Sequence, residues 1–265
     1  MSPSGGQYLL TVDELTALAG LMGRQIMVGV HVDGEPDAAH GIQTLLSRGL
    51  AAQDSEDTLR IPEDLEFCLD TVFAFDAYLS CTGWDRPKRA STLGVFVRSG
   101  SLVALSEEPA GRYALRWIPV LPLAIGAVAA YAEAVDRDEA GDVARMSAPV
   151  ADPAGFRDAL AERNAGLIGS VLAWGGWEAS QTAALAEELA FGTTRRFVGV
   201  SAFGAPDDLD LTLVTVGMRE YAVAVRRDQV EVATVNAVSA NHLIARWLSH
   251  ACSQSLAAAE KKVAQ

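Results

Sequence analysis

Residues 92–118 read TLGVFVRSGSLVALSEEPAGRYALRWI, and this stretch decides the fold. It holds short runs rich in β-branched and aromatic residues, which are separated by the turn segments RSGS and EEPAG. Runs bounded by Gly, Pro and Ser in this way predict antiparallel strands joined by hairpins. A similar run, AYLSCTG, precedes this stretch at 77–83. We therefore expect four strands, at 77–83, 92–97, 102–105 and 113–118, followed by an apolar helix at 122–135.

The same order of elements recurs further along the chain. An acidic stretch at 136–142, DRDEAGD, reads as a linker that runs on to Ala148-Pro149. Beyond it we expect two helices, four strands and a closing helix, at 156–174, 180–190, 197–203, 211–218, 221–225, 230–235 and from Ser239 onward.

The recurrence predicts an α+β fold (α/β in broad terms) made of two pseudo-symmetric halves, 1–142 and 143–265. Each half has helices, a mostly antiparallel four-stranded unit and a closing helix. Thr92 and Thr212 open equivalent strands, 212 − 92 = 120 residues apart. Four strands alone would leave an edge and a face uncovered, so we expect the halves to form one compact pseudo-twofold domain.

The N-terminal region carries a different pattern. A helix start at Thr11, a second helix over 37–48, a short strand near 59–61 and a helix after Pro62 together resemble a winged helix. This leaves open a transcriptional regulator that binds DNA. Its recognition helix would contain one basic residue, Arg48, which is poor chemistry for binding phosphates.

Charge and cysteine content narrow the classes of function. The chain has 265 residues and a net charge of −13, which argues against nonspecific affinity for nucleic acid. Three cysteines without CxxC spacing are typical of reduced core thiols. The N-terminus lacks the features of a signal peptide, and the most apolar run, 117–132, is short for a membrane span. We therefore expect a cytoplasmic protein, monomeric or homodimeric, that does not insert into membranes.

Motifs for catalysis or cofactor binding are missing from the sequence. It contains no GxGxxG, GxxxxGK[ST], HExxH or GxSxG. His242, His250 and Cys252 fall on the closing helix but do not share one face at about 100° per residue. We expect no cofactor, no metal and no catalytic activity, although an enzyme of unrecognised class remains an alternative.

Two tryptophan-containing segments are the candidate partner-binding residues. The loop predicted between the first two strands, 84–89, holds Trp84, Arg86, Lys88 and Arg89, whereas its counterpart 205–210 is acidic. Trp and Arg are enriched at interfaces, so this basic loop on an acidic protein could be a recognition surface, or simply a solvated turn. A second segment places Trp174 and Trp177 around two glycines, either as exposed anchors or as core residues at a helix break.

A family resemblance covers most of the chain. The segments LTVDELTALAGLMG (10–23) and GIQTLLSRGLA (41–51) resemble the first two helices of EspG proteins, chaperones associated with ESX (type VII) secretion. The segments VRSGSLVAL (97–105) and VGMREYAVAVRRDQVEV (216–232) are similar to the paired strand blocks of that family. The resemblance implies a quasi-twofold fold with an antiparallel sheet. It also implies a non-catalytic protein that binds helical secretion substrates, such as PE–PPE-type pairs, and keeps them soluble.

Overall fold

The structure is a computed structural model, and its description leaves out residues 1–5, 25–29, 31–33, 56–57, 87–88, 133–144, 150–154, 157–158, 161, 163, 175–177, 192–196, 204–209, 217–218, 227–228, 235–236 and 264–265. By its internal contacts the chain divides into two compact units, which are described separately. Unit 1 comprises Met1–Ser80, Ser91–Ala127 and Leu248–Gln265. Unit 2 comprises Cys81–Ala90 and Val128–Trp247.

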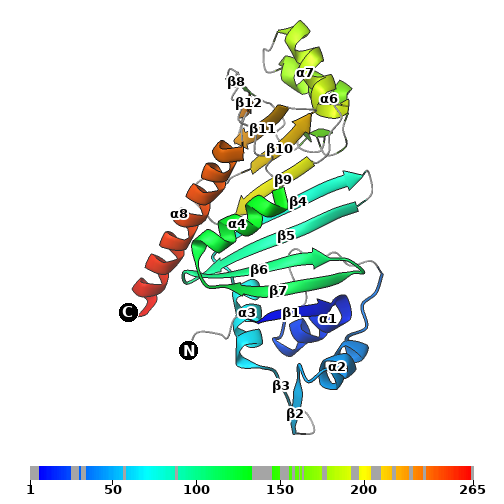
Figure 1. The fold of residues 1–265 in the computed structure, drawn as a ribbon, viewed down its shortest axis with the longest axis vertical. Coiled ribbons are helices and arrows are strands. Elements are labelled where there is room, and N and C mark those ends of the chain that lie inside the picture. The colour runs from blue at the N-terminus through cyan, green and yellow to red at the C-terminus, as the bar shows by residue number, and fades with distance from the viewer. Residues whose placement is uncertain are drawn as a thin grey trace. The chain divides into compact units, whose positions relative to one another are not determined.

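The elements up to residue 132 are three helices flanked by short strands, then four strands and a helix. In chain order they are β1 (Gln7–Thr11), α1 (Val12–Leu21), α2 (Ala38–Ser47), β2 (Ala52–Ser55), β3 (Thr58–Arg60), α3 (Glu63–Phe73), β4 (Ala77–Arg86), β5 (Arg89–Arg98), β6 (Ser101–Glu108), β7 (Arg112–Ile118) and α4 (Leu121–Ala132). Figure 1 shows them in colours from blue to green.

The remaining elements follow the same plan. They are β8 (Arg145–Pro149), α6 (Ala165–Trp174), α7 (Ala179–Phe191), β9 (Phe197–Phe203), β10 (Asp210–Val216), β11 (Arg219–Arg226), β12 (Gln229–Thr234) and α8 (Ala237–Val263). The predicted α+β fold with two similar halves is therefore confirmed, including the four-stranded antiparallel run and the closing helix in each half.

The two runs of strands have the same topology. The first is ordered β1-β7-β6-β5-β4 and the second β9-β10-β11-β12-β8. In each, a strand that precedes the helices pairs antiparallel with the last of the four consecutive strands, as β1 does with β7 and β8 with β12. The repeat therefore includes a fifth strand that the sequence pattern did not reveal.

The β5–β6 turn shows how local chemistry sets the register. Arg98 pairs with Ser101, which leaves only Ser99 and Gly100 between the strands. Their φ angles are 49° and 77°, and two consecutive left-handed residues form the turn whose twist matches that of a hairpin. The Ser-Gly pair therefore makes the turn that the residue types at this point predicted.

Each unit has a hydrophobic core of its own. In unit 1, α3 packs against β6 and β7, α1 packs against β1, and α2 packs against α1. The buried residues of this core include Leu10, Leu18, Leu69, Phe96 and Tyr113. In unit 2, α6 and α7 pack together over β11 and β12. Their buried residues include Leu172, Leu189, Tyr221, Val223 and Val232.

Several predicted boundaries were wrong. Ala148-Pro149 belongs to β8, not to a linker, because proline is tolerated in an edge strand; residues 136–142 lie outside the described residues. The helix predicted over 156–174 is divided, since α6 starts at Ala165 after Asn164, whose side-chain oxygen accepts the Leu167 amide hydrogen bond at 3.0 Å. The closing helix begins at Ala237, two residues before its predicted start, and continues to Val263.

Candidate functional site

The predicted basic loop turns out to be largely strand. Trp84 and Arg86 lie in β4 and Arg89 lies in β5, so only residues 87 and 88 separate the two strands. The predicted loop boundaries were wrong because ladder hydrogen bonds belong to the backbone and continue through polar side chains. Lys88 and the side chains of Trp84, Arg86 and Arg89 lie outside the described residues, so their role in binding stays a prediction.

For the second tryptophan segment, a role in binding likewise stays a prediction. Trp174 is the last residue of α6, and Trp177 falls among the residues 175–177 that the structure leaves out. The side chain of Trp174 also lies outside the description. The structure therefore neither brings these two tryptophans together nor separates them.

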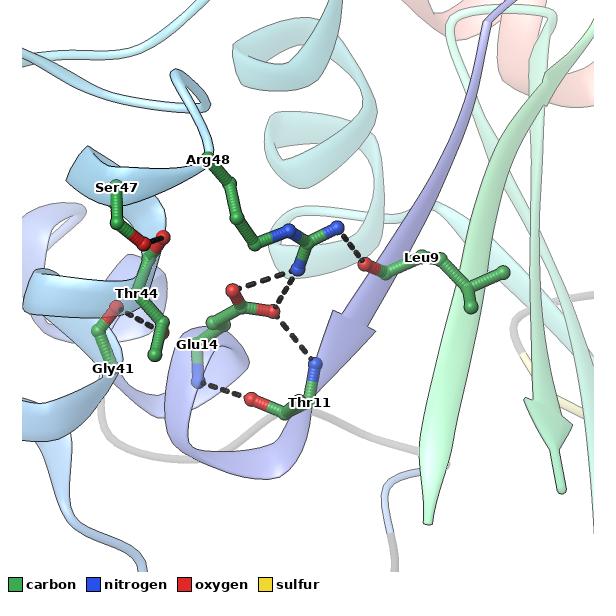
Figure 2. A network of polar contacts seen from close by, with 7 residues as sticks. All are labelled: Leu9, Thr11, Glu14, Gly41, Thr44, Ser47 and Arg48. Atoms are coloured by element: carbon green, nitrogen blue, oxygen red, sulfur yellow. Dashed lines mark hydrogen bonds and ion pairs between the residues drawn. The ribbon is translucent and has the colours of Figure 1, made fainter. Parts of the chain in front are cut away.

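A polar network at the start of the chain accounts for Arg48. Thr11 caps α1, and its backbone N–H donates to Glu14 Oε2 at 2.9 Å while the Glu14 N–H donates to Thr11 Oγ1 at 3.2 Å. Figure 2 shows that Arg48, at the end of α2, reaches back to this cap. Its Nη1 lies 2.7 Å from both Glu14 oxygens, and its Nη2 donates to the carbonyl of Leu9 at 2.8 Å.

Burial makes this network a structural one. The Glu14 side chain is 1% exposed and that of Arg48 is 42% exposed. A carboxylate so far removed from water needs a charged or hydrogen-bonding partner, and Arg48 supplies it. The single basic group of the predicted recognition helix is thus engaged by the protein itself, which further weakens the case for a DNA-binding segment.

The first two helices are held together at a second point. Asp37 caps α2, accepting the His40 amide hydrogen bond at 3.0 Å, and its own N–H donates to Asp13 Oδ1 at 2.9 Å. Gly41 lets the helices approach closely, since a Cβ placed there would lie 2.1 Å from the Asp13 carbonyl oxygen. The α1–α2 pair is therefore fixed by polar contacts and by close packing.

Another polar cluster within unit 1 involves the second half of α8. Ser255, 4% exposed, donates to Asp76 Oδ2 at 2.5 Å and accepts the Gly100 amide at 3.2 Å. The Ser99 amide also donates to Asp76 Oδ2, at 3.0 Å. Burial acts to raise the pKa of Asp76, but these hydrogen bonds, with Lys262 and Arg98, outweigh it and lower the pKa.

Neither of these clusters was found by reading the sequence. The Thr-x-x-Glu capping pattern at Thr11–Glu14 was a visible signal for half of the first one. Nothing in the sequence links Arg48 to Glu14, or Ser255 to Asp76, because the partners are 34 and 179 residues apart.

Two of the three cysteines, Cys68 and Cys81, are buried. Burial, with the charge of Asp64, raises the pKa of Cys68 to about 12, and burial raises the pKa of Cys81 to about 12. The thiolate is the reactive and metal-binding form, so these positions are poor nucleophiles near neutral pH. Among the described residues, no three His, Cys, Asp or Glu side chains gather as a metal-binding group.

Among the described residues, exposed large apolar side chains occur at four helices, including Leu21 at the end of α1 and Leu256 in α8. At α4, Val120 just before the helix is 50% exposed and Leu123 within it is 57% exposed. In α6, whose sequence AGLIGSVLAW has no charged residue, Leu167 is 40% exposed. No helix in the described part of the chain is both long enough and apolar enough to cross a membrane.

Comparison with known proteins gives a likeness in fold. No protein-family model matches the sequence, and no curated protein matches it. Among solved structures, a chain of the Mycobacterium tuberculosis type VII secretion system chaperone EspG5 in complex with the PE25–PPE41 dimer is similar, with a TM-score of 0.58. The match has 14% sequence identity and covers 93% of this chain and 95% of that chain. The chain thus has an EspG-like fold.

Proposed function

We propose that this chain is a cytoplasmic, non-catalytic chaperone of type VII secretion, which binds helical secretion substrates and keeps them soluble. The observation that carries the proposal is the extent of the fold likeness: it runs over 93% of this chain and 95% of a chain solved in a complex of EspG5 with the PE25–PPE41 dimer. A likeness of that extent concerns the whole arrangement of strands and helices, and not one shared supersecondary motif.

The surface chemistry agrees with a binding role. A chaperone for apolar segments needs exposed apolar side chains, such as Leu123 on α4 and Leu167 on α6, together with enough charge to remain in solution. The net charge of −13 supplies the second requirement. Arg48 is bound to Glu14 and is therefore a poor ligand for phosphate, and the raised pKa values of Cys68 and Cys81 make these two thiols poor nucleophiles.

The β4–β5 hairpin is the contact region we propose within this function. Its strands run to Arg86 and from Arg89, so Trp84 and the neighbouring arginines sit on a paired backbone with a very short connection. A tryptophan whose backbone is held in a strand loses less conformational freedom on binding than one in an open loop. If it is buried in an interface it contributes about 2 kcal/mol or more, and in solvent it contributes almost nothing.

The test is co-purification with a PE–PPE-type pair encoded by the same organism. We expect the variant Trp84→Ala/Arg86→Glu/Arg89→Glu to fold like the wild type but to recover much less of the pair. A matched control is Arg112→Glu/Arg116→Glu, which makes the same charge change at two exposed positions of another strand, β7.

Three results would contradict the proposal. Failure of the wild type to retain any such pair removes the chaperone function. Equal recovery by the triple variant and the wild type removes the hairpin from the interface. Equal loss in the triple variant and the control reduces the effect to net charge.

A further inference from the structure

The Glu14–Arg48 network lies along the edge of a sheet. β1 ends the strand order of its sheet, with β7 on its one paired side. Exposed edge strands carry unpaired N–H and C=O groups that can pair with another chain, so proteins commonly block them. In β1, side chains of this network bind two of the backbone groups that face away from β7.

The outward-facing groups of β1 follow from strand geometry. The N–H and C=O of one residue point to the same side of a strand, and this side alternates from residue to residue. The Leu9 carbonyl is bound by Arg48 and the Thr11 N–H by Glu14, two residues apart and on the same side. Figure 2 shows Arg48 and Glu14 on the side of β1 away from the green strands.

These contacts occupy the positions that an added strand would need. A new strand would have to bond to Leu9 and Thr11, and to do so it would have to displace the Arg48 guanidinium from the Leu9 carbonyl. Nη1 of that guanidinium is also held 2.7 Å from both oxygens of the buried Glu14, so it does not leave easily. Displacing it would leave a buried carboxylate without its partner.

We infer that the Glu14–Arg48 pair is an edge lock, which prevents a second copy of this chain from pairing with β1. The partner in the unlocked state is another β1 running antiparallel and centred on Leu9, so that Gln7 of one copy meets Thr11 of the other. This arrangement uses the same outward groups on both copies, as a twofold interface requires. The lock is independent of the proposed chaperone function.

In unit 2 the corresponding edge strand, β8, has a different feature that disfavours pairing with an added strand. β8 ends the other strand order, and its last residue is Pro149. Proline has no N–H to offer an added strand and is a common feature of edge strands. Two strands at equivalent places in the repeat thus carry two different devices against strand addition.

The lock is tested with a variant that opens the edge without leaving a buried charge. In Arg48→Met/Glu14→Gln, methionine keeps the aliphatic bulk but cannot donate to Leu9, and glutamine can still accept from the Thr11 amide. We expect the sedimentation coefficient of this variant to rise with concentration relative to the wild type. We also expect the Leu9 amide to become protected from hydrogen exchange as association proceeds.

A third substitution shows whether β1 is the surface involved. The Leu9 N–H points to the open side, so Leu9→Pro removes a donor that the β1–β7 pairing does not use. Added to the double variant, it should restore the sedimentation behaviour of the wild type. The control is Arg98→Met/Asp70→Asn. Like Arg48, Arg98 binds both a carboxylate and a backbone carbonyl: its Nη1 lies 2.8 Å from Asp70 Oδ2 and 2.9 Å from the Asp70 carbonyl oxygen, but it is not at a sheet edge. It should not associate.

The outcomes separate cleanly. A folded double variant that sediments like the wild type overturns the inference, and so does association that Leu9→Pro leaves unchanged or that the control shares. If the double variant does not fold, Arg48→Lys replaces it, because one ammonium keeps the charge beside Glu14 without the second arm to Leu9. Sedimentation of Arg48→Lys identical to that of the wild type would equally overturn the inference.

Discussion

Replacing Gly41 by alanine should destabilise the α1–α2 pair, although alanine is the better helix former. The Cβ would lie 2.1 Å from the Asp13 carbonyl oxygen, 2.5 Å from its carbonyl carbon and 3.0 Å from the Ala17 Cβ. The first two atoms belong to the backbone of α1 and cannot rotate away. The helices must therefore move apart, or α1 must bend.

The size of the effect follows from these distances. Ordinary contact begins at 3.4 Å, so the carbonyl and the new methyl must separate by 3.4 − 2.1 = 1.3 Å. That shift also disturbs the 2.9 Å hydrogen bond from the Asp37 amide to Asp13. Overpacking of a well-packed contact costs about 1–3 kcal/mol, and we expect the upper end because backbone atoms are involved. The gain of about 0.5–1 kcal/mol from helix propensity offsets part of it.

Gly126→Ala is the matched control for this substitution. Gly126 lies inside α4, is exposed, and has nothing within 4 Å of the point where the new methyl group would lie. The same chemical change should therefore stabilise the protein by about 0.5–1 kcal/mol. Urea unfolding followed by circular dichroism and tryptophan fluorescence gives both differences, provided that the two transitions coincide. A Gly41→Ala variant as stable as the wild type, or more stable, refutes the close approach of α1 and α2.

Two further predictions concern the ion pairs and the thiols. Arg48→Ala should lower the free energy of unfolding by about 3 kcal/mol, because it leaves the buried carboxylate of Glu14 without its charged partner. Arg98→Ala breaks an exposed ion pair and should lower it by at most about 1 kcal/mol. Equal urea midpoints for the two variants would contradict this prediction. Cys68 and Cys81 have pKa values of about 12, so they should react with a thiol reagent at pH 8 only after the protein unfolds. Rapid labelling of either cysteine in the native protein would show that burial does not suppress its thiolate.

The binding residues illustrate how far a local pattern can be read. Tryptophan beside arginines marked the β4–β5 hairpin as a candidate surface because residue type alone carries information on interfaces. The extent of the strands there could not be read from residue type, since ladder pairing extended β4 through Trp84 and Arg86. The polar clusters of Glu14 and Asp76 went unnoticed because each depends on a partner distant in the chain.

The amino-acid sequence by itself determined the periodic part of this protein. Three kinds of signal act within a few neighbouring residues: apolar runs of about four to eight residues, turn residues such as Ser99-Gly100, and the capping pattern at Thr11. The order of helices and strands, and the repetition of that order, could therefore be derived from the sequence. Only the tertiary structure decided that β1 pairs with β7 and that β8 pairs with β12. In the first pair, Thr11 and Arg112 are 112 − 11 = 101 residues apart. In the second, Arg145 and Ala233 are 233 − 145 = 88 residues apart, and local sequence does not specify contacts over such distances. It also decided that Arg48 reaches Glu14. Edge-strand pairing and buried ion pairs gain their free energy from groups brought together by folding, and short strands such as QYLLT and RMSAP carry no local signal of the partner that stabilises them.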